Sequence, residues 1–364
     1  MDLAYKEDWS EAKQRLRAWW EHENFGRCGL QVCAPRAGVP PTPPPNRPAT
    51  PEAMWYDLEY QSALREWEFQ RTFYGGEAVP VWNGGYPGHT GHPVLLGCPI
   101  DLDFTTGWTH PYPALAGESI DYKALKIDEN SKAFRFLLSL LRRGVQESRG
   151  KSIPAAGMCC GVGTTLDALR GTERLLFDCV DRPDEVRAAE LYLIDQWCRL
   201  YDRFHAITQE AAEGSVDWFG IWSPGKGCAV QNDFSYMISP KMYDEIFLPA
   251  VLRQLDFLDY SIYHVDGIGS FVHVDTLCRL PRLRAIQILP GEGKPSPLHY
   301  LPLLKKVQAA GKNLHIMIGP EEVEAALTEL SARGLMIVTW CASEAEARDL
   351  LKRAEGWSKD RKAG

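Results

Sequence analysis

The sequence predicts an α/β fold, specifically a (β/α)8 TIM barrel formed by residues 1–364 as a single domain. Three observations predict it. The chain has 364 residues, a length that one barrel can use fully. Eight segments have the composition of buried strands, and most are followed by a helical pattern. No G-x-G-x-x-G sequence joins a strand to a helix, which disfavours the alternative, an open doubly wound sheet.

The eight strands account for the barrel in chain order. They are expected at 28–34, 78–83, 153–158, 216–222, 260–267, 285–289, 314–318 and 336–340. Helices are expected at 51–73, 131–147, 164–170, 184–210, 239–258, 272–278, 302–310, 320–333 and 343–354.

Three further segments lie outside this alternation. Residues 1–26 form a helical extension, in which Trp9 to Glu23 has an amphipathic pattern. Residues 35–51 are rich in proline and cannot be regular structure. Residues 84–125 carry few periodic signals, so we expect an irregular insertion after the second strand.

Composition limits the classes of partner. The chain carries 48 acidic and 40 basic residues, a net charge of −8, whereas a nucleic-acid surface needs a basic footprint. No apolar run approaches the roughly 18 residues of a membrane span, and the N-terminus lacks a signal-peptide core. Ten scattered cysteines without a C-x-x-C pair fit reduced thiols. We therefore expect a cytoplasmic protein that binds neither nucleic acid nor membrane.

The segment from Tyr260 to Gly267 combines the composition of a buried strand with two chemically active side chains at its end. His264 and Asp266 are two residues apart, so both project from the same face of the strand. This pattern is typical of an active-site rim. The structural alternatives are a hydrogen-bonded histidine and an ordinary Asp-Gly turn.

In a barrel, the residues that end the strands converge on one mouth. Here the polar or reactive residues at these ends are Asn83, Cys159, Trp222, His264, Asp266, Glu292 and Cys341. An imidazole, a carboxylate and a thiolate from His264, Asp266 and Cys341 could hold a zinc ion with an open fourth position. The alternative for Cys341 is that it serves as a small buried hydrophobe.

Other candidates would contact the substrate. Asn232 and Asp233 precede a helix cap and either bind substrate or form an Asx turn. Asp217 lies within the predicted fourth strand and is a candidate pocket carboxylate. Trp82 and Trp222 stand at predicted strand ends and suit an aromatic wall, although core packing explains most tryptophans. Asn83, which follows Trp82, is a further candidate for substrate contact.

Four segments together resemble the uroporphyrinogen decarboxylase superfamily. They are Ser239-Pro240 before a helix with an internal Pro249, the strand end 263–267, the segment 286–293, and Thr339-Trp340-Cys341. The resemblance covers residues 230–355 well and the first half loosely. It implies a (β/α)8 barrel, and the superfamily also includes zinc-dependent methylcobamide:coenzyme M methyltransferases.

Two departures from the family patterns indicate a branch. The methyltransferases carry His-x-Cys and a later Cys as zinc ligands; His264 and Cys341 match, but Asp266 stands where the first cysteine belongs. The decarboxylases carry an arginine-rich N-terminal signature, which residues 30–36 lack. The resemblance is therefore nearer to the methyltransferases.

The expected function is zinc-dependent transfer of a methyl group between a corrinoid, carried by a partner protein, and a small-molecule thiol. His264 and Cys341 would be zinc ligands. Asp266 would be a further ligand or a catalytic carboxylate, and Glu292 a catalytic carboxylate. One alternative is a metal-free decarboxylase or lyase in which Asp266 and His264 act as an acid–base pair. Another is a non-catalytic binding protein on the same barrel.

Overall fold

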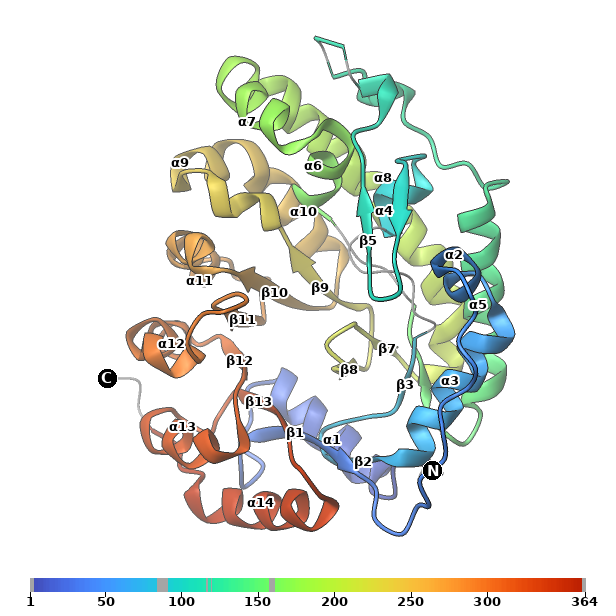
Figure 1. Cartoon of the computed structure of the whole chain (residues 1–364). Helices are drawn as coiled ribbons and strands as arrows, with labels where there is room; N and C mark the ends of the chain where they lie inside the picture. The colour runs from blue at the N-terminus through green and yellow to red at the C-terminus, as the bar shows by residue number, and fades with distance from the viewer. Residues whose placement is uncertain (1–2, 84–90, 116, 119, 157–160, 362–364) are drawn as a thin grey trace.

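The computed structural model describes residues 3–83, 91–115, 117–118, 120–156 and 161–361, and its centre is a largely parallel β-sheet (Figure 1). Seven strands follow the order β2-β1-β13-β12-β11-β10-β9. All neighbours are parallel except β1 and β2. A separate parallel pair joins β3 to β6. The fold is thus of the mixed α/β type that the sequence predicts.

The strands are β1 (Gly29–Pro35), β2 (Thr72–Gly76), β3 (Val81–Trp82), β4 (Ile100–Leu102), β5 (Gly107–Thr109), β6 (Ile153–Pro154), β7 (Ser215–Val216), β8 (Trp222–Ser223), β9 (Gly227–Gln231), β10 (Tyr260–Asp266), β11 (Ala285–Leu289), β12 (Asn313–Met317) and β13 (Leu335–Trp340). Over the described ranges, hydrogen-bonded ladders leave the β3–β6 pair separate from the larger sheet. The closed eight-stranded ring therefore stays a prediction.

The helices are α1 (Trp9–Trp20), α2 (Pro51–Trp55), α3 (Leu58–Arg71), α4 (Gly91–Leu95), α5 (Lys132–Ser148), α6 (Thr164–Arg170), α7 (Thr172–Asp181), α8 (Pro183–Ala212), α9 (Pro240–Met242), α10 (Leu248–Phe257), α11 (Val274–Cys278), α12 (Leu301–Ala309), α13 (Val323–Glu329) and α14 (Glu344–Trp357). Within the part of the chain that the structure describes, none is both long and apolar enough to cross a membrane.

The prediction of a fourth strand at 216–222 is wrong. This segment turns back on itself as the antiparallel β7–β8 hairpin. The side chain of Asp217 accepts hydrogen bonds from the backbone amides of Phe219 and Ile221, each at 3.0 Å, and Gly220 has a φ of +72°. These features favour a tight turn over an extended strand. The fourth parallel strand is instead β9, which follows the turn and pairs with β10.

The predicted irregular insertion at 84–125 contains more regular structure than expected. Residues 84–90 lie outside the described residues. Beyond them, α4 is a short helix, and β4 and β5 pair as an antiparallel hairpin. Segments this short offer too few residues for a periodic pattern to be detected.

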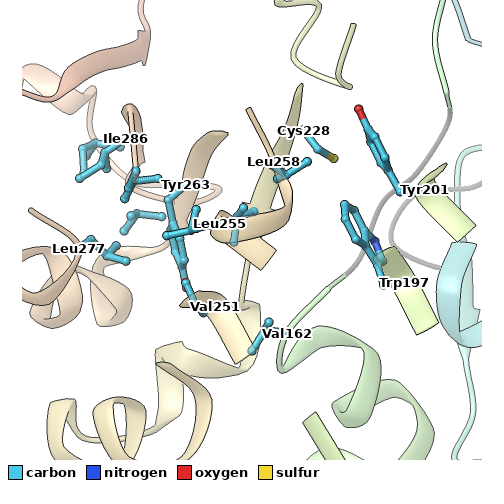
Figure 2. Packing of buried hydrophobic residues seen from close by; sticks show 14 of the residues in the cluster. Val162, Trp197, Tyr201, Cys228, Val251, Leu255, Leu258, Tyr263, Leu277 and Ile286 are labelled. Carbon is cyan, nitrogen blue, oxygen red and sulfur yellow. The ribbon is translucent and has the colours of Figure 1, made fainter. Parts of the chain in front are cut away.

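The two faces of the main sheet have different roles. Apolar side chains on one face, which we call the outer face, pack against helices α10 to α14. Figure 2 shows Tyr263 of β10 and Ile286 of β11 beside Val251 and Leu255 of α10. Because side chains alternate along a strand, the neighbouring residues project from the opposite, inner face.

Helix α1 covers the N-terminal ends of the strands. Its apolar residues Leu16 and Trp20 belong to a buried cluster with Ile262, Ala285 and Met336, which lie near the beginnings of β10, β11 and β13. The predicted helical extension is confirmed, although the helix ends at Trp20 rather than Glu23. The opposite, C-terminal ends of the strands remain available for a site.

Candidate functional site

A polar layer crosses the inner face of four adjacent strands. Gln231 of β9 is in register with His264 of β10, His264 with Gln287 of β11, and Gln287 with His315 of β12. All four side chains are at most 5% exposed. In β10, β11 and β12 the polar residue stands between outward-facing apolar residues, and the register of the strands brings all four side chains into one row.

Three potential metal ligands meet beside this layer, at the C-terminal ends of the strands. One ligand atom from each of Asp233, His264 and Asp266 lies within 4.8 Å of those of the other two. The Nε2 atom of His264 is 3.7 Å from an Oδ2 atom of Asp266. His264 and Asp266 come from β10, and Asp233 follows β9, its neighbour in the sheet. Adjacent parallel strands therefore deliver the group at their C-terminal ends.

Asp233 is held in place from two sides. Its Oδ2 accepts hydrogen bonds from Gln231 Nε2 at 2.7 Å and from the Thr164 hydroxyl at 3.3 Å, and its backbone amide donates to Thr164 Oγ1 at 3.1 Å. Its Oδ1 is buried and has no hydrogen-bond partner. A buried carboxylate oxygen without a donor is a costly arrangement, which a cation would relieve.

The start of α6 packs closely against this corner. Gly163 has a φ of +73°, and a Cβ atom there would lie 1.9 Å from Oδ1 of Asn232. That Oδ1 accepts a hydrogen bond from the amide of Ser235 at 3.1 Å. Asn232 thus forms the helix-capping turn that the sequence analysis considered as an alternative to substrate contact.

The environment of His264 combines burial with negative charge. Burial alone lowers the pKa of His264, but hydrogen bonding to Asp266 and Gln287 and the charge of Asp233 raise it above its ordinary value. Burial lowers the pKa of His315 to about 3, and the nearby His264 adds to this effect. Burial therefore keeps His315 neutral, whereas the surroundings of His264 favour its protonated form.

The β7–β8 hairpin lies against the polar layer. The edge of the Trp218 ring faces His264, with centroids 5.0 Å apart, and the Phe219 ring lies 5.6 Å from His264 and 5.2 Å from His315. Gln31 of β1 donates through Nε2 to the carbonyl of Gly220 at 3.0 Å. Asp217 closes the turn, and its burial raises its pKa to about 7.

Three apolar residues, which we call the apolar wall, follow Asp266 along the C-terminal edge of the sheet. Strands β11, β12 and β13 each end on an inner-face residue. These are Leu289, two residues after Gln287; Met317, two residues after His315; and Trp340, four residues after Met336. Met317 is 47% exposed and Trp340 is 64% exposed. Large apolar side chains that remain this exposed at the rim offer a surface to an apolar group.

The remaining predicted site residues lie elsewhere. Cys341 is buried and belongs to the apolar core between the sheet and its helices, outside the group of three ligands. Trp82 donates from Nε1 to Glu147 of α5 at 3.2 Å, so it faces the helix layer. Trp222 is fully buried against Trp9 of α1, with ring centroids 5.7 Å apart, at the N-terminal end of the strands.

Three more candidates are not part of the group of three ligands. Glu292 is exposed on the loop after β11, where Gly291 passes close to Gly267. Asn83 is half-buried directly after β3. Cys159 lies outside the described residues.

The sequence analysis missed Gln287, His315 and the two rings of Trp218 and Phe219. Gln287 and His315 each interrupt a buried strand as the single polar residue between apolar neighbours, in Ile286-Gln287-Ile288 and Leu314-His315-Ile316. That signal, applied to all predicted strands, would have identified the part of the polar layer on β10, β11 and β12. The hairpin could not be found in this way, because its segment had been interpreted as a strand.

Comparisons with known proteins show the fold but no family. The sequence matches no protein-family model and no curated protein. Among solved structures, a methyltransferase from Methanosarcina mazei is similar, with a TM-score of 0.60 and 14% sequence identity over 95% of this chain and 98% of that chain. At this identity the match establishes a shared arrangement of the chain over nearly its whole length.

Proposed function

We propose that the chain is a metal-dependent methyltransferase whose metal ion is held by Asp233, His264 and Asp266. The observation that carries the proposal is the convergence of their ligand atoms within 4.8 Å at the C-terminal ends of β9 and β10. The likeness in fold to a methyltransferase supports the type of reaction.

The donor set fits a divalent cation. One imidazole nitrogen and two carboxylate oxygens leave at least one position open, as in catalytic zinc sites. The buried, unpartnered Oδ1 of Asp233 also favours a cation at this point. Zinc is the metal we propose. Asp266 makes the set harder than one containing two thiolates, so the same site would also accept cobalt as a probe.

A bound zinc ion would lower the pKa of a substrate thiol and orient its sulfur. A sulfur lone pair then forms the new bond to the methyl carbon. The bond between that carbon and its donor breaks, and its electron pair remains on the donor, for which we propose a corrinoid on a partner protein. The thiol proton passes to a carboxylate. Glu292 is our candidate, because its loop passes close to Gly267, next to Asp266.

The other residues of the site would position the substrate and limit access of water. Met317 and Trp340 would cover an apolar part of the substrate beside the metal, and Leu289 links them to Asp266 along the rim. The rings of Trp218 and Phe219 cover His264 and keep it out of bulk water. A dry site strengthens the electrostatic interactions of the ligands.

Metal binding tests the proposal directly. The purified chain, stripped of metal, is titrated with Zn²⁺ against a chromophoric chelator. We expect about one tight equivalent per chain, weakened at least tenfold in His264→Ala and in Asp233→Asn. His110→Ala is the matched control, because His110 and Asp101 form an exposed pair at 2.7 Å beside the β4–β5 hairpin, outside the group of three ligands. Absence of stoichiometric zinc in the wild type would overturn the proposal.

A metal-free acid–base enzyme is the second candidate. It is favoured by the proximity of His264 and Asp266 and by the raised pKa of His264, which favours the protonated imidazole that a general acid needs. The reaction would then be a decarboxylation or lyase reaction. Activity that survives exhaustive chelation, and is lost in His264→Ala, would identify this candidate.

A further inference from the structure

Gln287 connects the two histidines of the polar layer. On the inner face of β11, it is in register with His264 on one side and with His315 on the other. Its Oε1 is hydrogen-bonded to Nδ1 of His264, and its Nε2 lies 3.0 Å from Nδ1 of His315. Gln287 and His315 are each 1% exposed. No residue of this pair is among the proposed metal ligands.

The chemistry of the amide fixes the direction of both bonds. The amide nitrogen of glutamine can only donate, so Nδ1 of His315 must accept and His315 carries its proton on Nε2. The amide oxygen can only accept, so Nδ1 of His264 must carry a proton. When His264 is neutral, its lone pair is therefore on Nε2, the atom that faces Asp266.

In the structure the amide directs Oε1 to His264 and Nε2 to His315, and aromatic rings lie beside both histidines. The Phe219 ring lies against both imidazoles, and the edge of Trp218 faces His264. A neutral imidazole has one acceptor nitrogen, and with the amide in this orientation the acceptor of His315 is Nδ1. If the amide rotated by 180°, its NH2 group would face Nδ1 of His264, and that atom would have to become the acceptor.

We propose that Gln287, oriented by His315, is a positioning residue that keeps the Nε2 lone pair of His264 directed toward the metal site. This inference rests on the proposed function, because it assigns the role of Gln287 to metal binding. Outer residues that orient a ligating histidine typically change metal affinity 10- to 100-fold when they are replaced.

Three variants test the effect on metal affinity. Gln287→Met keeps the length of the side chain but removes the acceptor, and we expect its Zn²⁺ affinity to fall 10- to 100-fold. Gln287→Glu retains an acceptor for Nδ1 of His264, and its affinity should stay within a few-fold of the wild type. Gln196→Met is the matched control: Gln196 of α8 is also a buried glutamine, but its Nε2 donates to the carbonyl of Leu125 and not to a histidine.

A second measurement depends neither on metal nor on the Gln287 variants. In the metal-free wild type at alkaline pH, nitrogen NMR of ¹⁵N-histidine-labelled protein should show His264 protonated on Nδ1 and His315 on Nε2, assigned with His264→Ala and His315→Ala. Protonation of neutral His264 on Nε2, or a Gln287→Met variant that is folded and binds zinc like the wild type, would overturn the inference. A wild type that binds no zinc would overturn the proposed function and leave the protonation pattern standing.

Discussion

The backbone amide of Cys341 donates to the carbonyl of Cys33 at 2.9 Å, which extends the pairing of β1 and β13 by one residue beyond Trp340. Because the extended conformation continues, side-chain alternation continues too, and Cys341 projects to the face opposite that of Trp340. Its thiol accordingly joins the core beside α14, where burial raises its pKa to about 11.

This placement predicts that Cys341→Ser binds zinc as tightly as the wild type, within about twofold, because the thiol is not directed at the proposed ligands. The serine hydroxyl in an apolar core should instead lower the free energy of unfolding by about 1–3 kcal/mol. Zinc titration and urea unfolding separate the two effects. Loss of zinc in this variant would restore the ligand set expected from the sequence, with Cys341 as a member.

Asp266→Cys should keep the metal and change its spectrum. The substitution shortens the side chain by little and supplies a thiolate, a strong ligand for zinc and cobalt. With Co²⁺ bound, we expect a sulfur-to-cobalt charge-transfer band in the near ultraviolet that the wild type lacks. Asp256→Cys, at an exposed position of α10, is the control and should add no such band. If Asp266→Cys also lacks the band, residue 266 does not contact the metal.

Gly163→Ala should disturb the corner that holds Asp233. The new methyl group would meet Asn232 Oδ1 at 1.9 Å and would also require a positive φ. We expect a loss of at least 2–3 kcal/mol of unfolding free energy and weaker zinc binding. Gly150→Ala is the control, because Gly150 has a similar φ of +68° but nothing within 4 Å of the added carbon. That variant should lose only about 1 kcal/mol, with zinc affinity unchanged.

Asp217→Asn should make the protein more stable at alkaline pH. Burial raises the pKa of Asp217 to about 7, whereas in the unfolded chain it is near 3.8. The folded state therefore binds the proton more tightly, and its stability falls as pH rises from about 4 to 7. Asparagine cannot ionise, yet its Oδ1 can still accept from the amides of Phe219 and Ile221.

At pH 8 the gain in unfolding free energy should be on the order of 2–4 kcal/mol, and it should shrink as the pH falls toward 4. Chemical unfolding across this pH range measures it. Asp349→Asn, at an exposed position of α14, is the control and should show no such trend. A variant that is less stable than the wild type at pH 8 would mean that the two backbone donors stabilise the ionised carboxylate enough that folding does not raise the pKa of Asp217.

The sequence predicted most of the C-terminal half of the fold and one part of the site. The strand expected at 285–289 is β11 with identical bounds, because Ala-Ile-Gln-Ile-Leu between turn residues has a clear β-strand signal. Strand β9 was missed, since Gly-Cys-Ala-Val-Gln has little β-branched content. His264 and Asp266 do lie together, since their two-residue spacing fixes their relation within one strand.

Relations between strands were harder to predict. Asp233 joins His264 only because β9 pairs with β10 in one particular register, and no spacing along the chain encodes that register. The direction of Cys341 depends on one backbone hydrogen bond beyond the end of β13. Trp82 lies at a strand end as expected, but alternation turns it toward α5.

The turn between β7 and β8 covers one side of the site but does not belong to the main sheet that carries the ligands. The ligands and the apolar wall stand on strands whose register is fixed by their neighbours, whereas Trp218 and Phe219 stand on a loop closed by a single carboxylate. Exchanging these two aromatic residues for smaller ones would leave more space beside His264 without altering the sheet. Substrate size and metal chemistry could thus diverge separately among proteins with this architecture.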